Sequence, residues 1–470
     1  MSPPLATQAL DNPYSGDVSA SVTLLTPDEA MAQVRASAAT QRIWAAETSI
    51  EERSALVARF IDALEADADR VAADISKMMG KTLKMARGEV FGVRERAEAM
   101  MALAPTALAP DRLEAKDNFE RRIEKVPVGV VLCIAPWNYP LLTAINCIAS
   151  AVLAGNSVQI KHSSRTPLCA DAFERAFAAA GAPLGLVQAL HVSGPALDEV
   201  IALPEVGFVS FTGSVGVGRK VYSNVARQRF IDVTLELGGK DAAYVAADAD
   251  VQAAAAGLVD GAFYNAGQSC CAIERVYVHE DVHEEFMAAA LEEVRAYRLG
   301  DPMDEATTMG PLALPSAPSF LQAQVDDAIS KGARLLCGGT PTMDAAGKGR
   351  FFAPTLLDGC DHTMEIMREE SFGPVLGVQK VASDAEAAAL MNDSDFGLTA
   401  VLFTSDVDRA ERMASIVEAG TIFMNRCDYL DPLLVWTGVK DSGKGYSLSK
   451  YAFRSVTRLK SIHFKLDPNA

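Results

Sequence analysis

The chain has 470 residues, a formal net charge of −18, 49% apolar residues and 22% charged residues. At roughly 150 residues per domain, this length suggests two or three globular domains with large cores rather than a disordered chain. Acidic residues outnumber basic ones, and the sequence contains no block of Lys or Arg. We therefore expect no nucleic-acid partner and no binding to anionic membranes.

The cysteines indicate the compartment in which the chain works. The thiols are scattered without metal-ligand spacing, at positions 133, 147, 169, 270, 271, 337, 360 and 427. We therefore expect no disulfide framework, no metal site and a reducing cytoplasmic environment. The opening segment 1–17 contains neither a basic stretch nor an apolar one, so no secretory signal is predicted.

The first hundred residues are predicted to be helical. Thr26-Pro27-Asp28-Glu29 has the pattern of a capping box with proline at the first helical position. A second such signal, Ser49 to Glu52, precedes a helical run that we expect to continue to residue 79 and to stop at Gly80.

Residues 126–160 carry no charged side chain, which is long enough to suggest a membrane span. Pro136, Asn138 and Pro140 interrupt the stretch in its middle. Two shorter buried elements explain the segment better than one span, so no membrane partner is expected.

From about residue 128 the chain alternates between short apolar strands and helices. Expected strands are GVVLCIA, SVQIK, LVQALHV, GFVSF and IDVTLEL, with helices between them. Such repeats predict a parallel sheet covered on both faces, with ligands beyond the carboxyl ends of its strands. A second α/β set follows residue 239 and continues to about residue 425, and the tail RLKSIHFKL alternates like an edge strand.

Cys270 lies in the segment Asn265-Ala-Gly-Gln-Ser-Cys270-Cys271-Ala, just after a glycine turn between a helix and a strand. A thiol there can be accessible and can direct its own backbone N–H at a carbonyl oxygen. From these residues alone, a pair of buried structural cysteines is the competing interpretation.

Three further segments contain candidate functional residues. Glu236 ends an apolar strand, where partial burial would raise its pKa and suit a general base, although from these residues alone a surface glutamate at a turn is the favoured interpretation. In PWNYP, Asn138 can direct its amide at an oxyanion, or the segment can be a plain turn. The glycines from Gly213 to Gly218 join a strand to a helix, where backbone can approach phosphates.

Taken together, the motifs PWNYP, FTGS, LELGGK, GQSCCA, EESFGPV, FGLTA and GTIFMN occur in an order that resembles the aldehyde dehydrogenase superfamily. The resemblance covers the chain from about residue 20 to its end. It implies an α/β fold with a Rossmann-like parallel-sheet cofactor domain (1–106 and 128–237) and a second α/β catalytic domain (238–438). A small β oligomerisation hairpin would come from 107–127 and 439–470, within a homodimer or homotetramer.

The resemblance also implies the chemistry. Cys270 would be the nucleophile, Asn138 and the Cys270 backbone N–H would form the oxyanion hole, and Glu236 would activate the hydrolytic water. An aldehyde would thus be oxidised to an acid with NAD or NADP, through a thioester. Three alternatives stay open: a coenzyme A-acylating relative, which typically lacks the Glu236 carboxylate, a non-catalytic relative, and a cysteine hydrolase without a cofactor.

Cofactor contacts follow from the same resemblance. Those implied are Trp137 and Ser214 with Gly213 near the pyrophosphate, Lys161 at the adenosine ribose, and Glu370 with Phe372 at the nicotinamide ribose. Ser164 stands where the family often has a glutamate that repels a 2′-phosphate, so NADP is permitted, and Arg165 would pair with that phosphate if it pointed inward.

Other positions depart from the family pattern or imitate other motifs. Cys147 occupies the place of a common lysine, which leaves the proton route from Glu236 open. Thr143, Asn146, Ser269, Cys271 and Arg426 would face or flank the substrate tunnel, and a salt bridge of Arg426 with Asp428 or Asp431 is an alternative to carboxylate binding. The zinc-like segment 279–283 begins at a strand end, and the P-loop-like segment 438–445 lacks its Ser/Thr, so neither is expected to bind its ligand.

Overall fold

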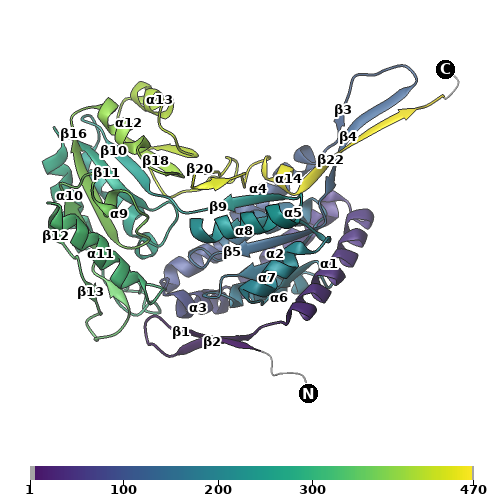
Figure 1. Ribbon diagram of the computed structural model, residues 1–470, viewed down its shortest axis with the longest axis horizontal. Helices are drawn as coiled ribbons and strands as arrows, with labels where there is room; N and C mark the ends of the chain where they lie inside the picture. Colours follow the sequence, from purple (N-terminus) through teal and green to yellow (C-terminus); the bar gives the residue numbers. More distant parts are fainter. Residues whose placement is uncertain (1–5, 468–470) are drawn as a thin grey trace.

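The computed structural model describes residues 6–467, in which two sheets are flanked by helices (Figure 1). Residues 1–5, which belong to the opening segment in which no secretory signal is predicted, lie outside the described residues. The last three residues of the predicted C-terminal oligomerisation segment do so as well.

The N-terminal region differs in two places from the helical expectation. An antiparallel hairpin, β1 (Thr7–Asp11) and β2 (Val18–Thr23), precedes the first helix. Both predicted capping boxes are confirmed, at Thr26 and Ser49, but the expected helix to residue 79 is interrupted at Asp67. Gly80 ends the second piece in a left-handed conformation, as predicted. The helices are α1 (Pro27–Glu47), α2 (Ile50–Ala66), α3 (Ala68–Met79) and α4 (Leu83–Ala107).

The first sheet has six strands in the order β21-β9-β8-β5-β6-β7, all parallel except β21. The chain runs outward from β5 through β6 to β7 and then returns to the other side of β5 as β8. The carboxyl ends of β5 and β8 therefore flank the point where strand order reverses, which is where such sheets bind ligands. The strands are β5 (Val130–Ala135), β6 (Ser157–His162), β7 (Val187–Ala189), β8 (Val206–Thr212), β9 (Asp232–Glu236) and β21 (Gly443–Lys444).

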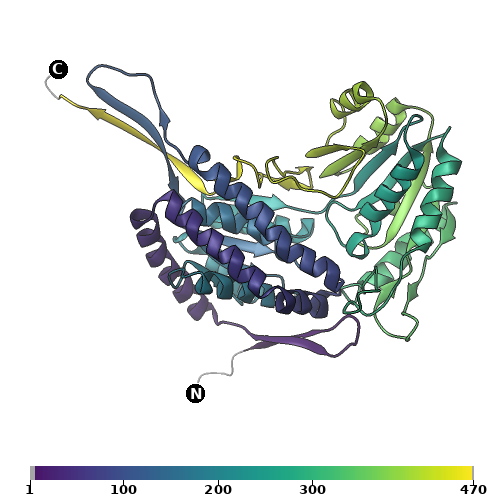
Figure 2. The ribbon, with the colours of Figure 1, turned by 180° about the vertical axis from the view of Figure 1, so that it is seen from behind.

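Helices cover both faces of this sheet. Successive apolar side chains of each buried strand point to opposite faces, so each face has its own hydrophobic core for helices to cover. Val131 and Cys133 of β5 pack with α2 to α6, while Val130 and Leu132 pack with α1, α7 and α8. The long N-terminal helices lie across one face in the rear view (Figure 2). The additional helices are α5 (Leu142–Leu153), α6 (Leu168–Ala179), α7 (Gly194–Ala202) and α8 (Val215–Gln228). The expected doubly covered parallel sheet is confirmed.

The uncharged stretch 126–160 forms β5, α5 and most of β6, as the prolines predicted. Within residues 6–467, no helix is both long enough and apolar enough to cross a membrane.

The second sheet has seven strands in the order β12-β15-β16-β11-β10-β18-β19, with only β12 antiparallel to its neighbour. Its strands are β10 (Asp241–Val245), β11 (Ile273–His279), β12 (Arg334–Cys337), β15 (Thr355–Asp358), β16 (Val375–Val381), β18 (Thr399–Phe403) and β19 (Thr421–Met424). Its helices are α9 (Val251–Phe263), α10 (His283–Arg295), α11 (Ala317–Ser330), α12 (Asp384–Asn392) and α13 (Val407–Ala414). The consecutive strands β9 and β10 belong to different sheets, so the chain passes between the sheets at residues 237–240.

A third, three-stranded antiparallel sheet projects from the body (Figure 1). It consists of β3 (Asp111–Arg112), β4 (Phe119–Pro127) and β22 (Thr457–Lys465), and β22 forms one edge, as the alternating tail predicted.

Short elements complete the chain. They are the pairs β13 (Pro341–Thr342) with β14 (Phe351–Phe352) and β17 (Phe396–Gly397) with β20 (Val439–Lys440), and the helix α14 (Ala452–Ser455). The P-loop-like segment 438–445 contains β20 and β21 and opens no helix.

Candidate active site

The site lies where the carboxyl edge of the first sheet faces the amino edge of the second. Asn138 follows β5 and Glu236 ends β9, whereas Cys270 precedes β11 and Glu370 precedes β16. Residues that are far apart in sequence therefore line one region between the sheets.

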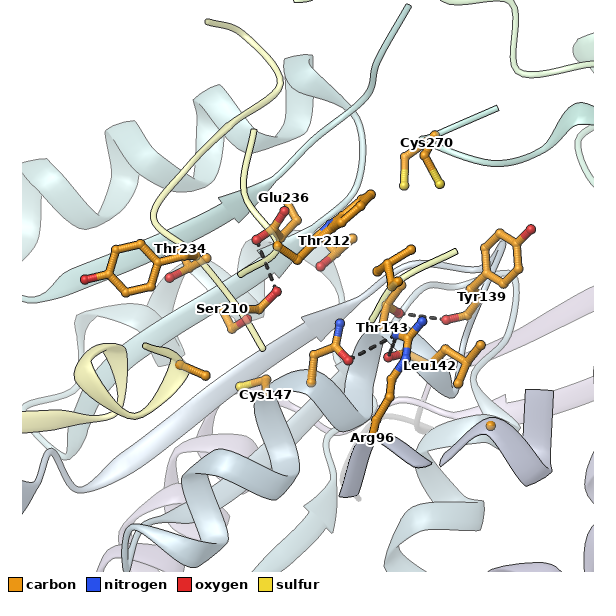
Figure 3. Close-up of a pocket in the computed structure, with 18 of the residues that line it drawn as sticks. Arg96, Tyr139, Leu142, Thr143, Cys147, Ser210, Thr212, Thr234, Glu236 and Cys270 are labelled. Atoms are coloured by element: carbon orange, nitrogen blue, oxygen red, sulfur yellow. Dashed lines mark hydrogen bonds between the residues drawn. The ribbon is translucent and has the colours of Figure 1, made fainter. Parts of the chain in front are cut away.

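Two cavities occupy this region. The larger one has a volume of about 630 Å³ and the smaller one about 380 Å³. Thr212, Glu236, Leu237 and Cys270 line both of them. Figure 3 shows Glu236 and Cys270 on the wall of the smaller cavity. The predicted nucleophile and the predicted base thus lie at the junction of two spaces, each large enough for a ligand.

A strained turn holds the Cys270 loop. Asn265 and Ala266 have left-handed φ angles of 53° and 57°, which non-glycine residues rarely adopt. Asn265 Nδ2 donates hydrogen bonds to the backbone oxygens of Gln268 at 3.1 Å and of Asn138 at 3.3 Å. The loop of the thiol is thereby tied directly to the loop of the predicted oxyanion-hole amide. The sequence alone indicates no role for Asn265.

The structure distinguishes the two neighbouring cysteines. Cys270 is partly exposed, whereas Cys271 is buried and its Sγ donates to Asp428 Oδ1 at 3.0 Å. The adjacent Cys270 thiol and burial raise the pKa of Cys271 well above its usual range. A buried thiol with a raised pKa is a poor nucleophile, which leaves Cys270 as the better candidate.

Glu236 is 8% exposed. Its Oε1 accepts a hydrogen bond from Ser447 Oγ at 3.3 Å, and its Oε2 has no partner among residues 6–467. Burial raises the pKa of Glu236 well above its ordinary value, and the Ser447 hydrogen bond partly opposes this rise. Such a carboxylate accepts a proton more readily than an exposed one.

The larger cavity contains all of the predicted cofactor contacts. They are Trp137, Lys161, Ser164, Gly213, Ser214, Glu370 and Phe372. The rings of Trp137 and Phe372 meet edge to face at 5.4 Å. Asn138 lines this cavity as well, so the structure brings together every residue of the predicted site.

Glu370 lies tightly against the glycine turn between the sheets. A Cβ at Gly238 would come within 2.4 Å of Glu370 Oε1, and the Gly239 backbone N–H donates to that oxygen at 3.1 Å. Burial raises the pKa of Glu370 to about 8. A side chain at Gly238 would displace the Glu370 carboxylate, and a Cβ at Gly239 would come within 2.6 Å of the Cys270 backbone oxygen, so each glycine permits a different close contact.

One buried network that the sequence analysis missed positions this part of the site. Glu274 accepts Lys240 Nζ at 2.6 Å and the backbone N–H groups of Ser371 and Phe372 at 2.7 and 2.9 Å. Lys240 belongs to the LELGGK motif, but its partner lies on β11, and no local pattern connects the two.

Two arginine expectations are resolved by the fold. Arg165 forms an ion pair with Asp11 of the N-terminal hairpin and does not line the larger cavity, so the condition for its phosphate role is not met. Arg426 stacks on the Tyr429 ring at 4.1 Å, and none of the ion pairs found among residues 6–467 joins it to Asp428 or Asp431. It also does not line the smaller cavity, whereas Thr143, Asn146, Cys147, Ser269 and Cys271 do.

The zinc-like segment is divided between two elements. His279 ends β11 and His283 begins α10, where its Nε2 lies 2.9 Å from Asp358 Oδ1. In the described part of the chain, no group of three or more His, Cys, Asp or Glu residues could hold a metal ion.

Comparisons with known proteins agree with this geometry. A family model described as "Aldehyde dehydrogenase family" matches residues 4–462. An aldehyde dehydrogenase of Paenarthrobacter nicotinovorans is 39% identical, over 88% of this chain and 90% of that protein. Succinate-semialdehyde dehydrogenase [NADP(+)] 1 of Mycobacterium tuberculosis is 35% identical, over 96% and 98% of the two chains. The structure of betaine aldehyde dehydrogenase from Staphylococcus aureus in complex with NAD+ superposes with a TM-score of 0.93 at 30% identity, over 98% and 92%.

Proposed function

The chain belongs to the aldehyde dehydrogenase family, and from this premise we propose that it oxidises an aldehyde to a carboxylic acid with NAD or NADP. Cys270 is the nucleophile and Glu236 the general base of this proposal. The observation that carries it is the position of both side chains at the junction of the two cavities. One cavity then holds the dinucleotide and the other the aldehyde.

The residues of the larger cavity fit a dinucleotide. Ser214 caps the N-terminus of α8, whose free backbone N–H groups favour a pyrophosphate, with Trp137 beside it. Lys161 would bind the adenosine ribose, and Glu370 would bind the nicotinamide ribose, with Phe372 packing nearby. When bound, the nicotinamide supplies the two-electron oxidation that the side chains of the chain lack.

Ser164 supports the use of NADP. It lines the larger cavity where a glutamate would repel a 2′-phosphate, and the mycobacterial relative is named for NADP(+). Because nothing in the Ser164 position disfavours a ribose hydroxyl either, the proposal includes NAD.

The side chains of the chain account for the remaining chemistry. The Cys270 thiolate adds to the aldehyde carbon while the Asn138 amide and the Cys270 backbone N–H donate hydrogen bonds to the carbonyl oxygen. Oxidation of this adduct leaves a thioester on Cys270. Glu236 then takes a proton from water, the water oxygen bonds to the thioester carbon, and the acid leaves as the Cys270 sulfur is released.

The Ser447→Ala variant tests how the protein sets the proton affinity of Glu236. The Ser447 hydroxyl favours the charged carboxylate, so its removal is expected to raise the pKa of Glu236 further. Deacylation requires the ionised form, so its rate should begin to rise at a higher pH than in the parent protein. The measurement is the pH profile of steady-state p-nitrophenyl acetate hydrolysis, with Ser447→Thr as the hydroxyl-retaining control. A profile that stays in place or moves to lower pH would show that Ser447 does not tune Glu236.

A panel of aldehydes with NAD and with NADP tests the proposed function itself. We expect reduced cofactor to accumulate with at least one aldehyde and the product to be the free acid, with or without added coenzyme A. Formation of an acyl-coenzyme A instead would favour the acylating alternative. No cofactor reduction with any aldehyde would contradict the oxidation.

We also propose that the chain forms a homodimer or homotetramer through the projecting sheet of β3, β4 and β22. The apolar side chains of Leu459 and Phe464 on β22 are 71% and 51% exposed, which supports a partner surface there.

A further inference from the structure

The smaller cavity contains one cation. Among its lining residues in the described chain, Arg96 of α4 is the only Lys, Arg or His. Figure 3 shows Arg96 extending from its helix towards Leu142 and Thr143, in the same cavity as Cys270. Burial lowers the pKa of Arg96, but a guanidinium remains charged at every pH at which proteins are studied.

Arg96 forms only neutral hydrogen bonds in residues 6–467. Its Nη1 donates to the Leu142 backbone oxygen at 2.7 Å and to Asn146 Oδ1 at 3.1 Å, and no carboxylate pairs with it. The neighbouring arginine Arg94, by contrast, pairs with Asp62, Glu65 and Glu98. Since buried charges in proteins are usually paired, the Arg96 guanidinium retains donor capacity for an anionic ligand.

A neutral donor lies beside Arg96. Because Asn146 Oδ1 accepts from Arg96, the amide N–H groups of Asn146 are left for a ligand. A carboxylate, with its two acceptor oxygens, matches such a set of donors.

The acidic residues of the cavity are engaged or shifted towards their neutral form. Glu95 accepts the Tyr429 hydroxyl at 2.8 Å, and Asp428 accepts the Cys271 thiol at 3.0 Å. Burial raises the pKa of Asp428 to about 6 and also raises that of Asp260. The negative charge of Asp428 is therefore reduced most below about pH 6.

We propose that Arg96, with Asn146, binds the distal carboxylate of a short ω-oxo acid whose aldehyde end reaches Cys270. The inference rests on the proposed aldehyde oxidation and names its substrate class. Arg96 acts as a specificity residue that does not enter the chemistry at the thiol. An aldehyde with a quaternary ammonium at the same place would instead be repelled.

The test compares three aldehydes that share an OHC–CH2–CH2 unit and differ only in the group attached to it. 4-Oxobutanoate has a carboxylate there, butanal a methyl group and 3-(trimethylammonio)propanal a quaternary ammonium. The parent protein should prefer 4-oxobutanoate. The Arg96→Met variant should lose about 10- to 100-fold in kcat/KM for 4-oxobutanoate, mainly through KM, as expected for a charged hydrogen bond. The kcat/KM of Arg96→Met for butanal should change less than about threefold. Arg96→Lys should retain part of the preference for 4-oxobutanoate over butanal.

Arg94→Met is the matched control, because it removes the same charge from the same helix outside the cavity. It should leave the preference for 4-oxobutanoate unchanged. If Arg96→Met fails to fold, Asn146→Leu removes the neutral donor beside Arg96 and should weaken 4-oxobutanoate selectively. Equal losses on 4-oxobutanoate and butanal, or a parent preference for the ammonium aldehyde, would overturn the carboxylate site but not aldehyde oxidation. Oxidation of none of the three by the parent protein would instead count against the proposed function.

Discussion

Replacing Cys270 by alanine is expected to reduce aldehyde oxidation and ester hydrolysis together, by about 1,000-fold or more. Both reactions need the same sulfur to form a bond to a carbonyl carbon. The partly exposed Cys270 is the thiol that lines both cavities. The measurement is steady-state formation of reduced cofactor from an aldehyde, alongside release of p-nitrophenol from p-nitrophenyl acetate.

Cys271→Ala is the matched control, because it removes the adjacent thiol, which is buried and hydrogen-bonded to Asp428. It should keep activity within about tenfold, since only packing and weak hydrogen bonds with Asp428 and Ser269 are lost. An inactive Cys271→Ala protein together with an active Cys270→Ala protein would instead identify Cys271 as the nucleophile.

The second large effect is expected for Glu236→Gln. This change keeps the size of the side chain and an acceptor for Ser447, but it removes the proton acceptor at the junction of the cavities. Steady-state turnover should fall about 100- to 10,000-fold, the usual contribution of a general base. The first turnover should survive, so p-nitrophenol should appear as a burst of about one equivalent per site, as acyl-enzyme accumulation requires.

An undiminished steady state in Glu236→Gln would show that another group activates the water. Loss of the burst together with turnover would place Glu236 in the acylation step instead. Glu236→Asp keeps the carboxylate on a shorter side chain. Comparing it with Glu236→Gln shows how much of the loss comes from removing the base and how much from moving it.

Much of the fold could be predicted because the signals are local. Continuous apolar strands alternating with helices predict a parallel sheet covered on both faces, and β5 shows why, with Val130 and Val131 entering opposite cores. The capping boxes at Thr26 and Ser49 likewise depend on residues three positions apart. The N-terminal hairpin and the break at Asp67 were missed because tertiary packing overrides weak local preferences there.

The site could be predicted as a set of residues but not as a geometry. Strand ends and turn glycines indicated Glu236, Asn138 and Cys270 one by one, and the family resemblance joined them. The contacts that tune them are distant in sequence: Ser447 lies 211 positions from Glu236, and Asn265 lies 127 positions from Asn138. Arg165 shows the same limit, since its partner Asp11 is 154 positions away. The direction in which the Arg165 side chain points could therefore not be predicted from the residues next to it in the sequence.

In the proposed mechanism, one particular sulfur carries the acyl group. Glu236→Gln protein treated with p-nitrophenyl acetate, then digested at low pH and sequenced by tandem mass spectrometry, locates that group directly. We expect an acetyl mass on Cys270 in the peptide that contains both cysteines. Acetyl on Cys271, or an unmodified peptide from protein that has released its full burst of p-nitrophenol, would contradict it.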